Sequence, residues 1–224
     1  MPKRIKMKGP LIPNNSQEAY DYFGMEAVSA KAITDAFPED NGDIVLEVNS
    51  NGGLVTVGSE IYTALKSYPG HITVEVTGMA ASAASVAIMG ADKILISPTA
   101  QIMIHKALFH WVSGNSDDLD KASNALKASD QSIVNAYAAK TGLSKGEILD
   151  MMKNETFMSA SVAVEKGFAD EVMTFDDVGA VASLESGLLP QAVIDDFYAN
   201  RSKRKSEIEN MLREIEKEEI LQGL

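Results

Sequence analysis

Short runs of aliphatic and β-branched residues recur along the chain and are separated by stretches with helical periodicity. Between them, small polar residues and glycine or proline mark turns. The predicted strands are 5–12, 43–48, 72–76, 93–96, 101–104 and 171–175. The predicted helices begin near Ser16, Ser29, Leu54, Ser82, Ser116, Ser144 and Ser159. Because strands alternate with helices, the sequence predicts an α/β fold with a parallel sheet and crossover helices.

The longest predicted helix spans residues 117–140 and has one apolar stripe opposite a charged face. The stripe consists of Leu119, Ala122, Leu126, Ile133 and Tyr137. Such a stripe is too apolar for a solvated surface, so we expect it to be buried, partly between subunits. From residue 190 the composition changes, and the narrow apolar stripe Ile208, Met211, Leu212 and Ile215 lies within a highly charged helix. The prediction is therefore a domain over 1–189 with a helical appendage at 190–224.

Composition narrows the class of protein. The 224 residues are 45% hydrophobic and contain no cysteine, which suits a reducing cytosol and excludes a thiol nucleophile or a thiolate metal site. Four basic residues in the first eight precede residues 9–200, which carry a net charge of −16. Because this negative charge repels phosphate groups, nucleic acid is disfavoured as a substrate or binding partner. No apolar run reaches membrane-spanning length and no secretory signal is evident, so we expect a cytoplasmic location.

Two stretches carry candidate chemistry. Ser82 falls where a buried strand meets a helix, and His105 follows the apolar strand 101–104, at the end of the strand where α/β sites lie. The pair Gly52-Gly53 follows another strand and could leave a backbone N–H open to a cleft, although a plain turn is its usual meaning. His71 fits an exposed position and His110 a loop near a site. No helical spacing of histidines supports a metal site, and no cofactor is expected.

Four motifs in order resemble the Clp family of serine proteases. They are Asn49-Ser-Asn-Gly-Gly-Leu-Val-Thr-Val-Gly58 with Ile61-Tyr62, Gly78-Met-Ala-Ala-Ser82, Met103-Ile-His105, and Glu155-Thr-Phe-Met-Ser-Ala160 followed by Ala163 to Asp170. The likeness covers roughly residues 5–175 and is most similar to the branch encoded by phages beside capsid genes. It implies a crotonase-like fold in which helix 117–140 projects as a handle for assembly.

The resemblance also implies roles for individual residues. Ser82 matches the nucleophile and His105 the general base, while the backbone N–H groups of Gly53 and Ala83 match the oxyanion donors. The family's aspartate is replaced by Glu155, whose extra methylene changes its reach, so Asp150 and Asn154 remain alternatives for the third member. Ser85 is the second candidate for the nucleophile, although the simpler interpretation is that it is a serine that packs between helices.

Two departures from the family pattern affect what we expect. Lys106-Ala107 stands where the family usually has a polar residue and a proline, and the segment before the first strand is short. We therefore expect a serine endopeptidase that assembles into a homo-oligomeric ring and processes phage capsid or scaffold proteins, with or without an ATPase. The rivals are a crotonase-type acyl-CoA enzyme and a silent ring-forming homologue. Cleavage specificity and ring size do not follow from the sequence.

Overall fold

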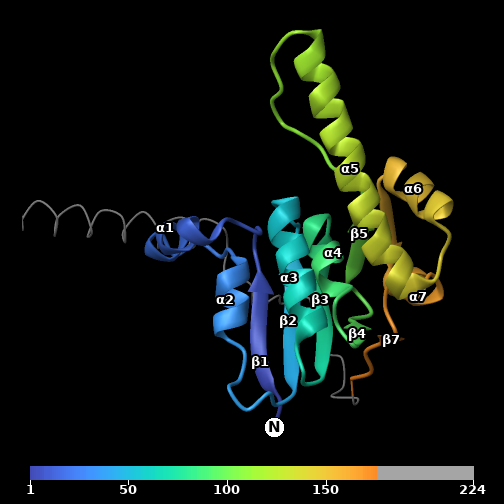
Figure 1. Ribbon diagram of the computed structural model, residues 1–224. Coiled ribbons are helices and arrows are strands. Elements are labelled where there is room, and N and C mark those ends of the chain that lie inside the picture. The colour runs from blue at the N-terminus through green and yellow to red at the C-terminus, as the bar shows by residue number, and fades with distance from the viewer. Residues whose placement is uncertain (176–224) are drawn as a thin grey trace, which may run out of the picture. The chain divides into compact units, whose positions relative to one another are not determined.

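The computed structural model describes residues 1–175 (Figure 1). Its strands are β1 (Lys3–Lys8), β2 (Ile44–Ser50), β3 (Ile72–Ala81), β4 (Lys93–Ile96), β5 (Gln101–Ile104), β6 (Thr156–Ser159) and β7 (Glu171–Val172). Its helices are η1 (Asn14–Ser16), α1 (Gln17–Tyr22), α2 (Ala30–Asp35), α3 (Val55–Ser67), α4 (Ala83–Ile88), α5 (Ser116–Thr141), α6 (Lys145–Lys153) and α7 (Ala160–Glu165). The predicted appendage at 190–224 and its boundary lie outside the described residues.

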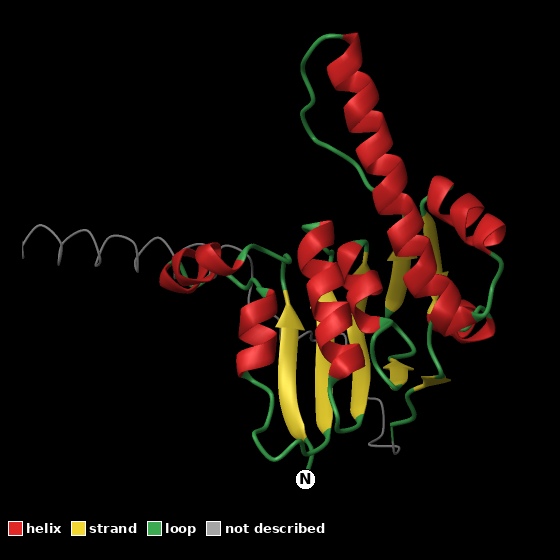
Figure 2. Cartoon of the chain, viewed as in Figure 1, coloured by secondary structure: helices red, strands yellow, loops and turns green. Residues whose placement is uncertain are grey.

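The strands form one mixed sheet that is parallel except at one edge (Figure 2). Strands β1, β2, β3, β4 and β7 lie in that order, all parallel to their neighbours. The long strand β3 pairs with β4 along its first half and with β5 along its last three residues, 79–81. Because β3 pairs with β5, the strands that lead to Ser82 and His105 lie side by side, and β6 pairs antiparallel with β5. The predicted α/β fold with a parallel sheet is confirmed.

Helices α2, α3 and α4 cover one face of the sheet (Figure 1), and alternation along the strands explains why. In β3, Ile72, Val74 and Val76 are fully buried, whereas Thr73 and Glu75 are partly exposed. On the polar face, the Arg4 guanidinium binds both Glu47 and Glu75 across three strands. One face of the sheet is thus the core and the other is a network of charges.

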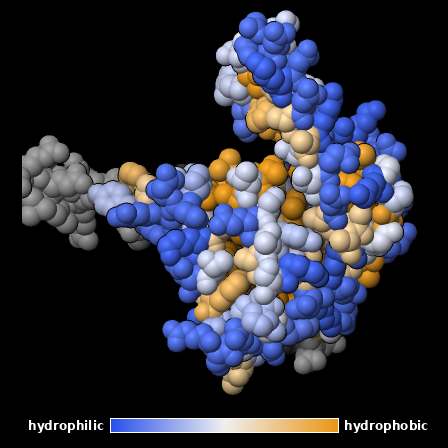
Figure 3. Space-filling view, viewed as in Figure 1, coloured by the Kyte–Doolittle hydropathy of each residue, from blue (hydrophilic) through white to orange (hydrophobic). Residues whose placement is uncertain are grey.

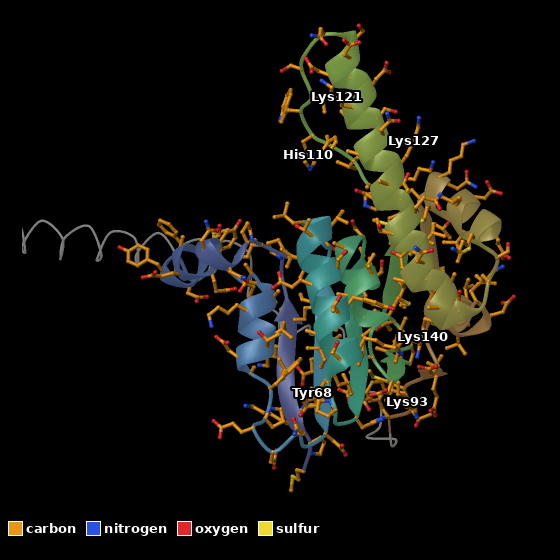
Figure 4. The ribbon with its side chains drawn as sticks, in the orientation of Figure 1. Tyr68, Lys93, His110, Lys121, Lys127 and Lys140 are labelled. Atoms are coloured by element: carbon orange, nitrogen blue, oxygen red, sulfur yellow. The ribbon has the colours of Figure 1, made fainter. Side chains whose placement is uncertain are left out.

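Helix α5 changes character along its length. Its C-terminal half packs on the sheet and buries Ile133 and Tyr137, whereas its N-terminal half projects beyond the sheet, where Leu119 is exposed (Figure 1). At the packed end, the Lys140 ammonium binds Asp170 Oδ2 at 2.9 Å and the Asp92 carbonyl at 3.2 Å (Figure 4). The apolar stripe predicted on this helix is therefore buried in its second half only.

Most predicted elements are present, but several of their bounds differ. Strand β1 spans Lys3–Lys8 where 5–12 was predicted, since Gly9 takes φ 78°, and β7 ends at Val172 where the prediction ran to residue 175. Strand β3 continues to Ala81, five residues further than expected, because residues 79–81 gain β5 as a neighbour. Strand β6 was not predicted from the sequence, since four residues carry too short a pattern. Helix α5 is capped by Asn115, not Ser116: Asn115 Oδ1 accepts the N–H of Asp118, whose carboxylate accepts the N–H of Asn115.

Candidate active site

Ser82 lies at a sharp turn between β3 and α4. Its backbone has φ 54° and ψ −126°, a region that residues with a side chain rarely occupy. The turn is held from two sides: the Ser82 N–H donates to the Met103 carbonyl at 2.9 Å, and Gly52 packs against it. A Cβ on Gly52 would lie 2.6 Å from the Ala81 carbonyl oxygen, so only glycine allows this approach. A strained strand-to-helix turn of this kind exposes the serine hydroxyl above the sheet.

His105 is the first residue after β5, at the same edge of the sheet. Since Met103 pairs with Ala81 in the parallel register, His105 extends past the end of β3 toward Ser82. Its Nε2 lies 2.6 Å from Ser82 Oγ, within hydrogen-bonding distance. A serine hydroxyl this close to an imidazole nitrogen can lose its proton to the ring as it attacks a carbonyl. The structure thus brings together the two residues that the sequence singled out.

Two backbone N–H groups open beside Ser82. Leu11 bridges the Gly52-Gly53 loop through the Gly52 carbonyl and the Leu54 N–H, which leaves the Gly53 N–H on the opposite side of the chain. Ala83 is the first residue of α4, so its N–H has no intrahelical acceptor. Both residues line the same cavity as Ser82 and His105. Two such donors can stabilise an oxyanion formed on the substrate.

Glu155 is not joined to His105. Strands β5 and β6 pair Ile104 with Thr156, so one further pair would set Glu155 opposite His105. Instead Glu155 takes φ 47° and its side chain is exposed. Within residues 1–175 no hydrogen bond or ion pair links the imidazole to Glu155, or to the alternatives Asp150 and Asn154. Its role as the third member stays a prediction.

The remaining candidates lie in different surroundings. Ser85 is fully buried, and its Oγ is 2.6 Å from the Ser82 carbonyl, 3.0 Å from that of Met103 and 2.8 Å from Tyr137 Oη. This places its hydroxyl within the core, and Ser85 is not among the residues that line the cavity. His71 is at the far end of β3, 3.6 Å from Asp92. His110 lies on the loop beside α5 (Figure 4) and lines the cavity.

The site opens into a cavity of about 690 Å³. Apolar side chains from three helices line it, including Val55 of α3, Val86 of α4, and Leu126 and Ile133 of α5. Figure 3 shows hydrophobic residues gathered at the end of α3 and α4 that lies below the projecting part of α5. An extended chain with an apolar side chain next to the reacting carbonyl fits such a lining.

Sequence reasoning missed Asp130, a buried carboxylate of α5 that binds the segment after His105. A signal was available, because Asp130 occupies the gap between Leu126 and Ile133 in the apolar stripe. In the described part of the chain, no group of three or more histidine or acidic side chains is placed to hold a metal ion. Nor does any helix within residues 1–175 have the length and apolarity to cross a bilayer.

Comparison with known proteins defines the class. The model of the Clp protease family matches residues 25–176. The ATP-dependent Clp protease proteolytic subunit 1 of Chlamydia trachomatis serovar D is 30% identical over 168 residues, which cover 70% of this chain and 88% of that protein. The corresponding protein of Chlamydia abortus is 29% identical over 180 residues, 75% of this chain and 94% of that protein. The proteolytic subunit of Cycas taitungensis is 33% identical over 137 residues, which cover 60% of this chain and 70% of that protein.

The fold and these matches define a peptidase, a class of hydrolase. The chain belongs to the Clp protease family.

Proposed function

We propose that this protein is a serine endopeptidase in which Ser82 is the nucleophile and His105 the general base. The observation that carries the proposal is the 2.6 Å contact between Ser82 Oγ and His105 Nε2 at the mouth of an apolar cavity. Serine is a weak nucleophile until a base accepts its proton, so this contact is the first requirement of the chemistry. Membership of a peptidase family supports the peptide bond as the bond that is broken.

The reaction proceeds in two halves. Ser82 Oγ attacks the peptide carbonyl while His105 Nε2 accepts its proton, and the carbonyl oxygen becomes an oxyanion. The N–H groups of Gly53 and Ala83 donate to that oxyanion. His105 then protonates the leaving amine, which departs and leaves an acyl-enzyme. Water attacks the acyl group, gives its proton to His105, and releases the second product as Ser82 recovers its hydroxyl proton.

Glu155 is the proposed partner of His105 Nδ1. In the β5–β6 register, the pair that would follow Ile104 and Thr156 is His105 and Glu155, so the two residues are adjacent to paired positions of neighbouring strands. A rotation of the exposed Glu155 side chain is the movement that the proposal requires. A carboxylate there would fix the tautomer of the imidazole and stabilise the imidazolium.

The proposed substrates are loosely folded proteins, with phage capsid or scaffold proteins as the natural case. The apolar cavity supports extended peptides with an apolar side chain beside the cleaved bond. We further propose a homo-oligomeric ring, because the relatives are proteolytic subunits and the projecting half of α5 exposes apolar side chains. Cleavage is proposed to proceed without ATP, and residues 190–224 are proposed to tether the enzyme to its substrate assembly.

The test is reaction with a serine-directed fluorophosphonate, followed by mass spectrometry of the labelled peptide. Wild-type protein should label at Ser82 and hydrolyse fluorogenic peptides with an apolar residue before the cleaved bond. Ser82→Ala and His105→Ala should each abolish both reactions, since the two residues act as a unit. An assembled wild-type protein that neither labels nor hydrolyses peptides would favour a silent ring-forming homologue. Turnover of an acyl-CoA without labelling would favour a crotonase-type enzyme.

A further inference from the structure

The segment that follows His105 has few attachments of its own. Between the end of β5 and the N-cap of α5, residues 105–114 form no regular element. Within the described part of the chain, this segment makes two hydrogen bonds: His105 Nε2 to Ser82 Oγ, and the Ala107 N–H to Asp130 Oδ1 at 2.9 Å. The general base is therefore at the root of a long loop, and one side chain of α5 holds that loop two residues further on.

Asp130 is placed for this contact. It lies on the face of α5 that also carries Leu126 and Ile133, and it is buried, with 9% of its side chain exposed. Its second oxygen, Oδ2, is 3.7 Å from the Lys106 ammonium. Removing a carboxylate from water is costly unless hydrogen bonds and a counter-charge compensate, and here both come from the two residues that follow His105. An apolar residue would fit this stripe at lower cost, so stability alone does not explain the aspartate.

The residue type at position 107 allows this contact. A proline there would restrict φ without help from other residues, but position 107 is alanine. Ala107 has no such restriction, but it has the N–H that a proline lacks. Asp130 accepts that N–H and restrains the same peptide from outside.

We propose that Asp130 is a positioning residue that holds the 106–107 backbone so that the His105 imidazole stays within reach of Ser82. This inference rests on the proposed function and deepens it, because it identifies how α5 restrains the general base. The essential property of Asp130 is the location of Oδ1, not its charge. In this structure the restraint acts on the C-terminal side of His105, at the start of the loop, since no carboxylate within residues 1–175 binds the other ring nitrogen of His105.

Two matched substitutions separate position from charge. Asp130→Asn keeps an oxygen at the Oδ1 position and removes the charge, whereas Asp130→Glu keeps the charge and moves the oxygens by one methylene. Asp130→Ala removes both. The control is Asp120→Ala, which removes an exposed carboxylate from the same helix. Each variant is measured in the full-length protein for kcat and KM on a fluorogenic peptide, for the rate of fluorophosphonate labelling at Ser82, and for its thermal transition.

Asp130→Asn should keep kcat within about threefold of wild type, while Asp130→Glu and Asp130→Ala should lower kcat roughly 10- to 100-fold with little change in KM. Labelling should slow by the same factors, and the control should match wild type. If Asp130→Ala shows no thermal transition, the test is whether kcat is higher in Asp130→Asn or in Asp130→Glu. A higher kcat in Asp130→Glu, or a folded Asp130→Ala with the wild-type rate, overturns this inference alone. A wild-type protein that does not label overturns the proposed function, and this inference with it.

Discussion

Tyr137 Oη lies 2.8 Å from Ser85 Oγ in the core, which joins helix α5 to the turn that carries Ser82. The Ser85 hydroxyl proton is directed at the carbonyls of Ser82 and Met103, so the Tyr137 phenol donates to Ser85. Burial raises the pKa of Tyr137 well above its usual range, and the phenol therefore stays protonated as a donor. The two carbonyls that this network fixes belong to the turn of Ser82 and to the strand that leads to His105.

Removing the Ser85 hydroxyl should destabilise the protein without removing the nucleophile. In Ser85→Ala the buried Tyr137 phenol loses its partner, and the free energy of unfolding should fall by about 1–3 kcal/mol. Tyr137→Phe leaves Ser85 bonded to backbone carbonyls and should cost less, and the double variant should be less than additive. Urea denaturation measures all three. Ser85→Ala should still label with fluorophosphonate; complete loss of labelling in a folded Ser85→Ala protein would make Ser85 the nucleophile.

The strained backbone of Ser82 predicts a stable but inactive variant. A residue with a side chain at φ 54° and ψ −126° stores about 1–3 kcal/mol of strain. Ser82→Gly relieves it, although the freedom of glycine in the unfolded chain offsets about 0.5–1 kcal/mol of the gain. Both Ser82→Gly and Ser82→Ala should be inactive, with Ser82→Gly more stable by about 1 kcal/mol. Equal melting temperatures would show that the turn is not strained.

Gly53→Ala should lose activity through the backbone. Gly53 has φ 151°, and a Cβ there would lie 2.3 Å from the Leu11 carbonyl oxygen, so the loop must move and take the Gly53 N–H with it. Loss of one oxyanion donor predicts a fall in kcat of roughly 100- to 1000-fold. Gly146→Ala is the matched control, because it lies in α6 with open space around its Cβ. Steady-state kinetics that show normal kcat for Gly53→Ala would remove this residue from the oxyanion site.

Glu155→Ala should lower kcat less than Ser82→Ala or His105→Ala does. The exposed Glu155 makes no contact with His105 in this structure, so on the proposed mechanism its loss would remove a contact that forms only when the side chain turns inward. Glu155→Gln should resemble Glu155→Ala if the charge on the imidazolium is what matters. Peptide hydrolysis measured across pH checks this. If both Glu155 variants hydrolyse peptides at the wild-type rate and Asp150→Ala does not, Asp150 and not Glu155 is the partner of His105.

Assembly should depend on the exposed half of α5. Leu119 is half-exposed there, and Trp111, the single tryptophan of the chain, is 95% exposed on the preceding loop. Leu119→Asp should weaken a ring, which light scattering would report as a lower mass at micromolar concentration. Leu126→Asp should weaken it too, but Leu126 also lines the cavity, so Leu119 is the cleaner choice. Trp111 emission should shift to the blue on assembly; a wild-type protein that is monomeric throughout would refute the ring.

The sequence by itself determined most of the elements and the two principal candidate side chains of the site. Strands 93–96 and 101–104 have the predicted bounds, and Val57, Ile61 and Leu65 of α3 are buried at the expected spacing. These features follow from hydrophobic periodicity, which is a property of neighbouring residues. Parallel strands bring their carboxyl ends to one edge, so the positions of Ser82 and His105 after β3 and β5 already implied their proximity.

Only the tertiary structure decided which distant groups meet. The bond from Ala107 to Asp130 joins residues 23 apart, and that between Ser85 and Tyr137 joins residues 52 apart. No local pattern encodes such pairs, because they depend on where α5 crosses the sheet. The same is true of Glu155, which has the expected place in the chain but takes φ 47° and has an exposed side chain. Periodicity specifies which face of an element is buried, and packing specifies which atoms on that face touch.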